Sequence, residues 1–373
     1  MVVHFFMCTS HSSPCFVYAY TRYIHSLTTK VEIMNMPTQK THTMAIRYPF
    51  VYNVGRCIHN GLSVAFGAYR RSTALILSGK ELSLLVNEHT SKLCRAFEER
   101  FSRKPCLAVV LVGDNPASKT YVKGKKKACD EIGIAHIDFT YDESLSQKSL
   151  LELVQSLNDD PNVDGILVQL PLPSHIDEVK VINSIDPAKD VDGFHPVNIG
   201  KLLLGQKSHI ACTPKGILRM LDHYGILTDS KDVCILGRSN IVGKPMAALL
   251  MQKDRNATVT ICHSLTPDIV PYVKRADILI SAVGHTNVVT SDMVKDGAVV
   301  IDVGMNRVPD PSKKSGYALR GDVDFANVEP KTSAITPVPG GVGPMTIAML
   351  MENTVVAACD QKGIDTADLE VLE

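Results

Sequence analysis

The stretch TYVKGKKKACDEIGI, residues 120–134, places a tyrosine four positions before a lysine. On a helix, Tyr121, Lys125, Ala128 and Ile132 would share one face, because these spacings return to the same side of the helix. Burial beside apolar side chains disfavours the charged form of a lysine, which would make Lys125 usable as a general acid or base near neutral pH. The alternative is that Lys125 only extends its alkyl chain along an apolar surface, and the spacing leaves both open.

The neighbouring lysines have a different expected role. Lys123, Lys126 and Lys127 lie mostly away from that face, so we expect them in solvent. A nucleic-acid-binding module would need a broader basic surface around them. Residues 1–78 carry seven Lys/Arg and one Glu, a net charge of +6, so residues 79–373 carry −6 because the total is zero. This acidic body predicts no nucleic-acid partner.

Two polar residues further along the chain are candidates for the same site as Lys125. Gln169 lies in the apolar run ILVQL, where a buried amide needs hydrogen-bond partners. Asp192 lies in AKDVDGFHP, directly before a glycine. Taken singly, a strand-end hydrogen bond explains Gln169 and a turn explains Asp192. Together with Lys125 they would supply a base, an orienting amide and a carboxylate able to bind an amino-heterocycle.

The elements that must position these residues alternate between strand and helix. An amphipathic helix is predicted over residues 79–101, and a second over 120–134, on either side of a buried strand at 106–113. A strand at 137–142, a helix at 146–160 and a strand at 163–173 follow. Such β-α-β-α-β alternation predicts a parallel sheet covered by helices.

A second alternating series begins near residue 214 and predicts a second lobe of the same α/β class. It ends in the segment ITPVPGGVGPMTIAMLMENTVVAACD, a Pro/Gly loop that opens a long helix, with Pro344 suited to the first turn. The remaining predicted elements are a helix at 214–225, a strand–turn–helix unit at 232–252, and strands at 257–264, 276–284 and 297–304. Two such lobes predict a cleft where their strand ends face each other.

A glycine turn in the second series predicts a nucleotide site. GRSNIVG follows the strand VCIL and leads into a helix, with Gly237 and Gly243 at its ends and Ser239 near the middle. A purely structural strand-to-helix turn is the alternative. The next strand ends in His263-Ser264 without an acid, and Arg238 is nearby, so NADP is favoured over NAD.

The first 78 residues are rich in Ser and Thr, and their composition is that of an organelle transit peptide. A disordered or wrongly assigned N-terminal extension is the alternative, and Met44 is a possible second start. We expect a mitochondrial destination, with the plastid as the alternative.

The ten cysteines contain no C-x-x-C pair and no Cys/His cluster with zinc spacing, so no metal site is expected. Cys94, Cys129, Cys234 and Cys262 lie in apolar runs and are expected to be buried free thiols. No apolar run approaches ~18 residues, which predicts no membrane span.

Seven stretches of the chain resemble bifunctional methylenetetrahydrofolate dehydrogenase/methenyltetrahydrofolate cyclohydrolase, in the order of that family and from about residue 76 to 360. The basic leader makes organelle-targeted, plant-like members the expected subgroup. The stretches are VGDNPASKTYVKGKKKACDEIGI, VDGILVQLPLP, DPAKDVDGFHPVNIGKL, CTPKGI, GRSNIVGKP, ATVTICHS and ITPVPGGVGPMTIAML.

The resemblance implies three parts: a leader at 1–75, a folate-binding catalytic domain at 76–213 plus 341–373, and a Rossmann-type NADP domain at 214–340. The last helix would thus return to the first lobe. The family also implies a homodimer. Some mitochondrial relatives that use NAD with magnesium and phosphate have Arg at the position of Ser264, so the serine here implies NADP and no metal.

The resemblance also implies roles for individual residues. Tyr121 would stack on the folate ring, Lys125 would be the key cyclohydrolase residue, Gln169 would tune it, and Asp192 would hold the pterin. Further substrate contacts would come from Val168, Leu170, Pro339, Gly340, Gly341, Val342 and Gly343. The cofactor would be contacted by Gly237, Arg238 and Ser239, with Ser264 at the 2′-phosphate.

The implied chemistry has two steps on tetrahydrofolate derivatives. A hydride leaves the methylene carbon of 5,10-methylenetetrahydrofolate for NADP, and water then opens the methenyl product to 10-formyltetrahydrofolate with the help of Lys125. The alternatives are another NADP-dependent two-domain amino-acid or hydroxy-acid dehydrogenase, which would not need the Tyr121/Lys125/Gln169/Asp192 set, and a pseudoenzyme that binds NADP without catalysis.

Overall fold

The computed structural model describes residues 74–313 and 316–370, together with four very short strands nearer the N-terminus. The chain divides into two units, residues 1–71 and 72–373. In the first unit, β1 (His4–Phe6) pairs antiparallel with β2 (Tyr18–Tyr20), and β3 (Ile58–His59) with β4 (Leu62–Ser63). The predicted leader and the alternative start at Met44 otherwise lie outside the described residues.

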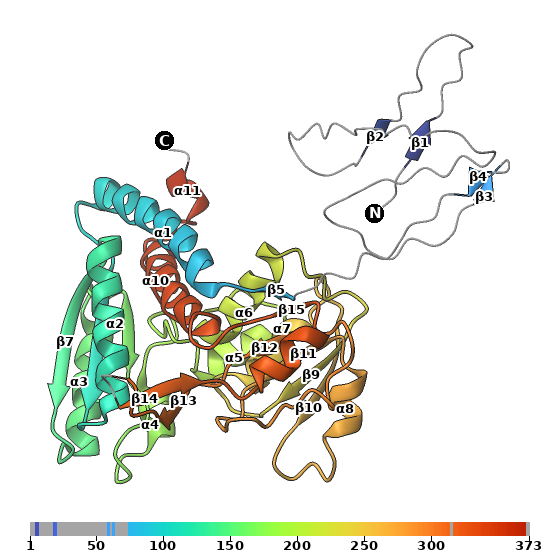
Figure 1. The fold of residues 1–373 in the computed structure, drawn as a ribbon. Helices are drawn as coiled ribbons and strands as arrows, with labels where there is room; N and C mark the ends of the chain where they lie inside the picture. The colour runs from blue at the N-terminus through green and yellow to red at the C-terminus, as the bar shows by residue number, and fades with distance from the viewer. Residues whose placement is uncertain are drawn as a thin grey trace. The chain divides into compact units, whose positions relative to one another are not determined.

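The first sheet of the second unit has three parallel strands in the order β7-β6-β8 (Figure 1). Its central strand β6 (Cys106–Val112) is buried along its whole length, which suits its unbroken run of apolar residues. The flanking strands are β7 (Ala135–Tyr141) and β8 (Gly165–Val168). The predicted parallel β-α-β-α-β unit is therefore confirmed.

Helices cover this sheet and begin where the sequence provides caps. At the start of α1 (Gly79–Phe101), the Ser78 side chain accepts a hydrogen bond from Glu81 N. At the start of α2 (Pro116–Ile132), the Asn115 side chain accepts from Ala117 N and Ser118 N. The layer on the other face includes α3 (Gln147–Asp159), whose Leu150, Val154 and Leu157 are buried at helical spacing. The helical periodicity is what the sequence prediction used; α2 begins at Pro116, four residues before the expected start at 120, because Asn115 caps it there.

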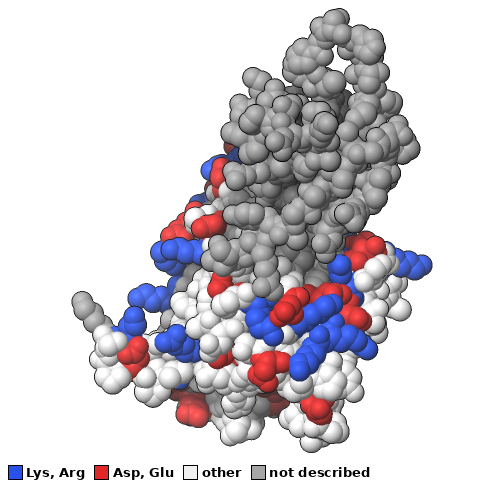
Figure 2. Space-filling view, turned by 45° about the vertical axis from the view of Figure 1, so that its right-hand side comes forward, with Lys and Arg blue, Asp and Glu red and all other residues white. Residues whose placement is uncertain are grey.

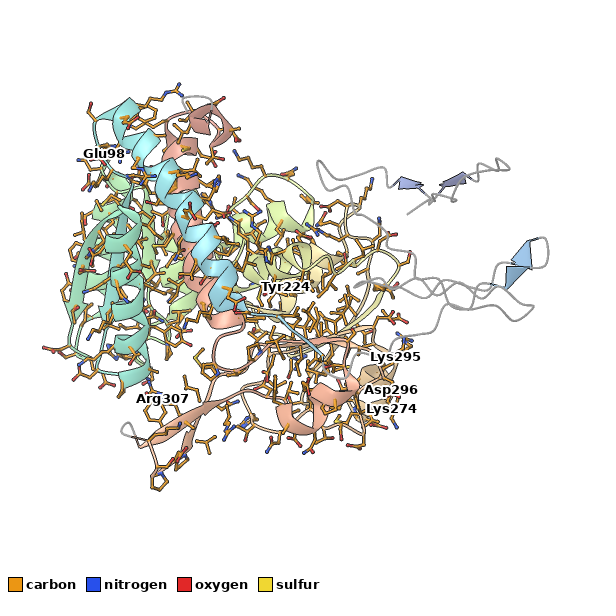
Figure 3. All side chains as sticks on the ribbon, turned by 45° about the horizontal axis from the view of Figure 1, so that its top comes forward. Glu98, Tyr224, Lys274, Lys295, Asp296 and Arg307 are labelled. Carbon is orange, nitrogen blue, oxygen red and sulfur yellow. The ribbon has the colours of Figure 1, made fainter. Side chains whose placement is uncertain are left out.

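The C-terminal helix α10 (Val342–Gln361) lies beside α1 in Figure 1, and it also packs on α2 and on α6 (Cys212–His223). This confirms that the last long helix returns to the first lobe. Directly after the C-terminal end of α6, the Tyr224 hydroxyl accepts from Ser78 N at 2.9 Å and donates to Ser78 O at 3.1 Å. Tyr224, which is labelled in Figure 3, therefore fixes the start of α1.

The second sheet has six parallel strands in the order β10-β9-β11-β12-β15-β5. Its helices include α7 (Gly243–Leu250) and α8 (Val270–Arg275). The strands are β9 (Asp232–Leu236), β10 (Thr258–Cys262), β11 (Ile278–Ser281), β12 (Val299–Asp302), β15 (Ala334–Ile335) and β5 (Leu75–Ile76).

The edge strand β5 differs from the sequence expectation. Ile76 was assigned to the first lobe, but β5 pairs with β15 at the edge of the second sheet. Two-residue strands carry no period-2 pattern, so only the long-range pairing reveals them. The other domain boundaries stay predictions.

Several shorter elements also escaped the sequence patterns. Among them, the antiparallel hairpin of β13 (Asn306–Pro309) and β14 (Tyr317–Arg320) extends from the second sheet toward the first lobe (Figure 1). The others are α4 (Glu178–Ser184), α5 (Pro196–Leu203), α9 (Phe325–Val328), the 3-10 turn η1 (Glu329–Lys331) and α11 (Ala367–Glu370).

One expectation about hydropathy needs correction. Within the described residues, α10 is long and apolar enough to cross a membrane by length and composition, although the sequence analysis found no such segment. However, 67% of its apolar window is buried inside the fold, as in the central helix of a protein core. Its apolar character is thus explained by packing against α1 and α6.

The cysteines and the surface charges agree with the sequence reading where they are described. Cys94, Cys129, Cys234 and Cys262 are buried free thiols. On the face shown in Figure 2, basic and acidic side chains are interspersed among the described residues. The lysines of α2 follow this pattern, because Lys126 pairs with Asp138 and Lys127 with Glu131.

Candidate active site

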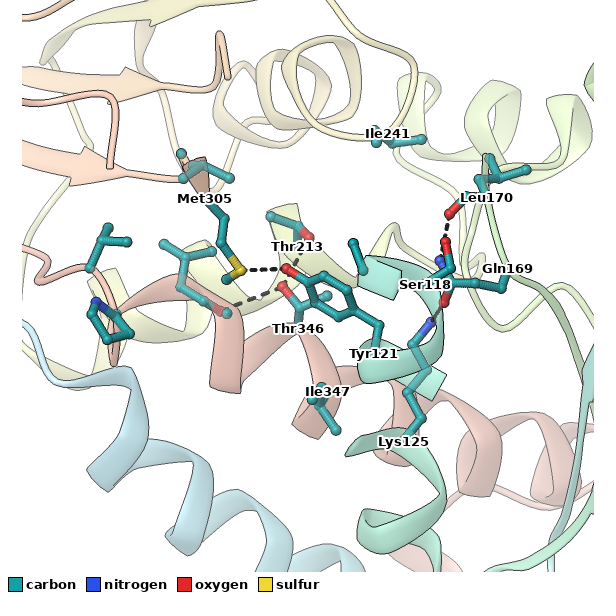
Figure 4. A pocket seen from close by; sticks show the side chains of 18 of the residues that line it. Ser118, Tyr121, Lys125, Gln169, Leu170, Thr213, Ile241, Met305, Thr346 and Ile347 are labelled. Atoms are coloured by element: carbon teal, nitrogen blue, oxygen red, sulfur yellow. Dashed lines mark hydrogen bonds between the residues drawn. The ribbon is translucent and has the colours of Figure 1, made fainter. Parts of the chain in front are cut away.

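A cavity of about 370 Å³ lies between the two sheets (Figure 4). One wall comes from α2 and the segment after β8, and the other from the turn after β12 and the loop before α10. It is lined by most of the residues expected at a substrate site, namely Tyr121, Lys125, Gln169, Leu170, Asp192, Pro339, Gly340, Gly341, Val342 and Gly343. Residues more than two hundred positions apart in the chain therefore meet here.

Lys125 is 8% exposed, and its Nζ donates to Gln169 Oε1 at 3.0 Å. The Gln169 Nε2 donates to the Leu170 carbonyl at 2.6 Å. Because the amide nitrogen is already engaged, the amide oxygen must face the lysine. The amine therefore ends in the cavity wall and has one fixed acceptor, which a lysine that merely extends along an apolar surface would not need.

Tyr121 lies one turn before Lys125 and lines the same cavity, as the helical spacing predicts. Its hydroxyl contacts the Met305 sulfur at 2.6 Å, so it bridges from the first lobe to the turn after β12 (Figure 4). Burial raises the pKa of the Tyr121 phenol, and the Arg307 guanidinium partly opposes this. The ring is a partly exposed aromatic surface suited to a planar ligand.

Asp192 faces the cavity from the loop between α4 and α5. Burial raises its pKa to about 6, with Lys125 lowering it and Asp190 raising it further. The loop is held by Asp190, which accepts from His195 N at 2.8 Å and from Asn198 Nδ2 at 2.8 Å. A half-buried carboxylate with few partners of its own is suited to accept hydrogen bonds from a ligand.

The loop before α10 contributes backbone to the cavity. Gly340 has φ +103°, a conformation that residues with a Cβ rarely adopt. Its carbonyl accepts from Lys80 N at 2.9 Å, which ties the loop to the start of α1. The glycines therefore allow a ligand to approach the main chain closely.

Two sequence expectations about the neighbourhood of Lys125 are corrected. Val168 was expected among the substrate contacts, but its side chain is 6% exposed and packs in the core with Val110 and Val154. Alternation along β8 directs it away from the cavity. Gln169 is not inside the strand, since β8 ends at Val168. Its position just past the strand end allows its amide to reach into the cavity.

The predicted nucleotide turn lies at the carboxyl end of β9. Gly237 has φ +114°, and a Cβ there would overlap with the Ala282 carbonyl. The Ser239 hydroxyl oxygen accepts from Val242 N at 3.1 Å at the start of α7. Ser264 follows the neighbouring strand β10, so it lies at the same edge of the sheet as Gly237, Arg238 and Ser239. None of the four lines the main cavity.

Sequence reasoning missed several cavity residues. Asp302 had a signal, because it is an acid at the end of the apolar strand VVID, two positions before Gly304. Ser118, Thr213, Ile241, Met305, Thr346 and Ile347 had none, because each lies in an ordinary local pattern and reaches the cavity only through the fold. Among the described residues, no group of three or more His, Cys, Asp or Glu side chains could hold a metal ion.

Comparison with known proteins gives two family matches. The tetrahydrofolate dehydrogenase/cyclohydrolase catalytic domain matches residues 77–192, and the NAD(P)-binding domain of the same family matches residues 211–362. The bifunctional protein FolD of Chlorobium luteolum is 53% identical over 285 residues, covering 75% of this chain and 97% of the relative. That of Salinibacter ruber is 54% identical over 287 residues, covering 77% and 96%.

Solved structures give similar matches. The bifunctional FolD methylenetetrahydrofolate dehydrogenase/cyclohydrolase from Campylobacter jejuni has 49% sequence identity and a TM-score of 0.73, covering 77% of this chain and 99% of that one. The methylenetetrahydrofolate dehydrogenase-cyclohydrolase of Trypanosoma brucei, solved with NADP cofactor and an inhibitor, has 37% identity and a TM-score of 0.74, covering 77% and 98%.

Proposed function

The chain belongs to the tetrahydrofolate dehydrogenase/cyclohydrolase family, and on that basis we propose how its own residues perform the two reactions. It is a bifunctional methylenetetrahydrofolate dehydrogenase and methenyltetrahydrofolate cyclohydrolase of one-carbon metabolism. It oxidises 5,10-methylenetetrahydrofolate to the 5,10-methenyl compound with NADP and hydrolyses the product to 10-formyltetrahydrofolate.

The residues at the edge of the second sheet fit NADP. NADP, when bound, supplies the acceptor for the hydride. Gly237 packs against the Ala282 carbonyl, where a side chain would overlap, and its φ of +114° suits a glycine turn between strand and helix; such turns bring main-chain N–H groups to a phosphate. The end of β10 offers Ser264 and no carboxylate, which avoids repulsion of a 2′-phosphate. We assign Gly237, Arg238 and Ser239 to the dinucleotide and Ser264 to the 2′-phosphate.

For the dehydrogenase, the chain mainly aligns the substrate. The substrate's own nitrogen lone pairs stabilise the cation that develops at the methylene carbon. The ring of Tyr121 and the carboxylate of Asp192 would hold the pterin from two sides of the cavity, and the Gly340 segment would contact it through backbone. Such positioning can supply a large part of a rate enhancement.

For the cyclohydrolase, Lys125 is the residue that moves the proton. Water attacks the electrophilic methenyl carbon, a C–O bond forms, and one ring C–N bond then breaks. The Lys125 amine would take one proton from the attacking water and return it to the leaving ring nitrogen, while the hydroxyl proton of the adduct goes to solvent as the formyl C=O forms. Gln169 would hold the amine through the 3.0 Å hydrogen bond and so keep it pointed at the substrate.

The observation that carries this proposal is the Lys125–Gln169 pair inside the cavity that also contains Tyr121 and Asp192. The test is a spectrophotometric assay of the full chain with 5,10-methylenetetrahydrofolate, following the methenyl compound, with NADP and with NAD. We expect turnover with NADP, poor turnover with NAD, and separate hydrolysis of supplied methenyltetrahydrofolate. Oxidation of amino acids or hydroxy acids instead would favour the alternative dehydrogenase.

Three further assignments come from the sequence and its resemblance. The +6 charge and the Ser/Thr-rich composition of residues 1–78 support a transit peptide, which we assign to a mitochondrion with the plastid as alternative. The plant-like subgroup and a homodimer rest on the resemblance. Imaging of the full chain fused to a fluorescent protein, and light scattering of the purified protein, test these points.

A further inference from the structure

Two buried aspartates lie next to each other under the cavity wall of the second sheet. Asp302 ends β12, is 3% exposed and lines the cavity. Asp322 follows the hairpin of β13 and β14 and is fully buried. Neither has a Lys or Arg partner among the described ion pairs. Burying a carboxylate costs free energy unless its oxygens accept hydrogen bonds. The donors bound to each aspartate therefore show which segments of the chain it positions.

Asp302 holds the turn that forms the cavity wall. Its Oδ1 accepts from Gly304 N and from Asp322 N, each at 2.9 Å, and its Oδ2 accepts from Val323 N at 3.0 Å. Gly304 and the next residue, Met305, both line the cavity, and Met305 contacts Tyr121. Asp302 therefore sets the position of the wall that faces the predicted folate site.

Asp322 holds the turn beside the nucleotide edge. Its Oδ2 accepts from Ser281 Oγ at 3.2 Å, from Val283 N at 2.8 Å and from Gly284 N at 3.3 Å. Its Oδ1 accepts from Asn306 Nδ2 at 3.1 Å, at the base of the hairpin. The turn that it holds includes Ala282, whose carbonyl lies against Gly237.

Two glycines, Gly304 and Gly321, leave the space that these carboxylates occupy. A Cβ on Gly304 would overlap with the Asp322 carboxylate, and a Cβ on Gly321 would overlap with that of Asp302. The two side chains thus connect the turn against Gly237, on the nucleotide side, with Gly304 and Met305, on the folate side. Hydride transfer has to cross this same junction.

We propose that Asp302 and Asp322 are positioning residues for hydride transfer, which fix the second-sheet wall of the cavity relative to the nucleotide turn. They touch neither Lys125 nor Gln169, so they act on the dehydrogenase and not on the hydrolysis. This inference rests on the proposed function. The cyclohydrolase, whose residues come from the first lobe, serves as an internal control for folding.

The main variant is Asp302→Asn, which keeps the shape but places an NH₂ group against a backbone N–H, since both carboxylate oxygens accept from N–H donors. We expect dehydrogenase kcat to fall about 100-fold, as for small misplacements of reacting groups. Hydrolysis of methenyltetrahydrofolate and the Kd of NADP should change less than about threefold on the same reasoning. With substrate deuterated at the methylene carbon, the isotope effect on kcat should rise, because hydride transfer becomes limiting.

Two more variants sharpen the test. Asp322→Asn should be milder, because its amide oxygen can keep the donors at Ser281, Val283 and Gly284 while Asn306 rotates its own amide to accept from the new NH₂. Asn306→Ala removes only the hairpin contact and should lower dehydrogenase kcat selectively even if Asp302→Asn does not fold. Asp310→Asn is the matched control, since the Asp310 carboxylate accepts from Ser312 N and Ser312 Oγ nearby in the hairpin.

The results divide cleanly. Selective loss of dehydrogenase in Asp302→Asn and Asn306→Ala, with a raised isotope effect, supports the inference. Equal loss of both activities would show a general structural role and overturn it, as would unchanged dehydrogenase in both variants. Wild-type protein without either activity would instead overturn the proposed function.

Discussion

The Lys125 amine is held 3.0 Å from the Gln169 amide oxygen, while the Gln169 amide nitrogen is bonded to the carbonyl of Leu170 (Figure 4). This arrangement gives the lysine a fixed acceptor at the wall of the cavity. A glutamine is suited to this task because it presents an acceptor and a donor at once and carries no charge. The pair is therefore the part of the cavity best suited to proton transfer.

Replacing Lys125 by methionine keeps the apolar stem and removes the amine. We expect hydrolysis of methenyltetrahydrofolate to fall by about 10²–10⁴-fold, the range for loss of a general acid–base group. The methenyl absorbance decay measures this directly. Lys127→Met is the matched control on the same helix, because Lys127 is exposed and pairs only with Glu131. Unchanged hydrolysis in Lys125→Met would refute the assigned role.

Replacing Gln169 by glutamate should also impair hydrolysis. A carboxylate 3.0 Å from the amine would favour the ammonium form, and it would lose the hydrogen bond donated to Leu170 O. We expect hydrolysis of methenyltetrahydrofolate to fall in the variant, measured by the decay of the methenyl absorbance, with hydride transfer less affected. Unchanged hydrolysis would show that Gln169 does not control the lysine.

The pKa of Asp192, raised to about 6 chiefly by burial, predicts a pH-dependent affinity for the pterin. Above pH 6 the side chain is a carboxylate and accepts hydrogen bonds from the ligand, whereas below it the proton removes this charge. The KM for methylenetetrahydrofolate should therefore rise as the pH falls from 7 to 5. Asp192→Asn should have a high KM that is flat over this range, and a wild-type KM that does not vary would contradict the assignment.

The same burial predicts an effect on stability. Because the pKa of Asp192 is higher in the folded protein than its ordinary value of 3.8, folding favours the protonated form, and stability falls as the pH rises from about 4 to 6. Asp192→Asn should then raise the Tm at pH 7 but not at pH 4. Thermal melts of both proteins at the two pH values test this, and equal shifts at both would rule out ionisation as the cause.

Ser264 is expected to select NADP. In Ser264→Asp, a carboxylate at the end of β10 would repel the 2′-phosphate, so the Kd of NADP should rise tenfold or more, about 1.4 kcal/mol. NAD, which has a hydroxyl there, should bind no worse. Isothermal titration calorimetry with both nucleotides provides the comparison, with Ser264→Ala as the uncharged control. Undiminished NADP affinity would count against this location of the phosphate.

The edge strand β5 defines how much of the N-terminus can be removed. Deletion of residues 1–71 should leave an enzyme with unchanged Tm and both activities. Deletion of residues 1–77 removes β5 and the fully buried Leu77, together with the hydrogen bonds from Leu75 N to Ser333 O and from Leu77 N to Ile335 O. We expect this second deletion to lower the Tm clearly, and equal Tm values would show that the strand does not stabilise the sheet.

Local patterns alone were enough to predict the α/β class, the parallel first sheet and the shared face of Tyr121 and Lys125. Helical and strand periodicities and glycine turns depend on neighbours within a few residues, so they can be recognised from the sequence alone. The resemblance then supplied what periodicity cannot, namely the folate chemistry and the return of the last helix.

Only the tertiary structure decided which distant residues meet. The pairing of β5 with β15 joins segments about 260 positions apart, and the Tyr121–Met305 contact joins residues 184 positions apart. The burial of Asp302 beside Asp322, and the orientation of Val168 into the core, depend on the same long-range packing. Such contacts leave no local pattern, because each is set by how whole sheets and helices pack and not by the preferences of the residues beside it in the chain.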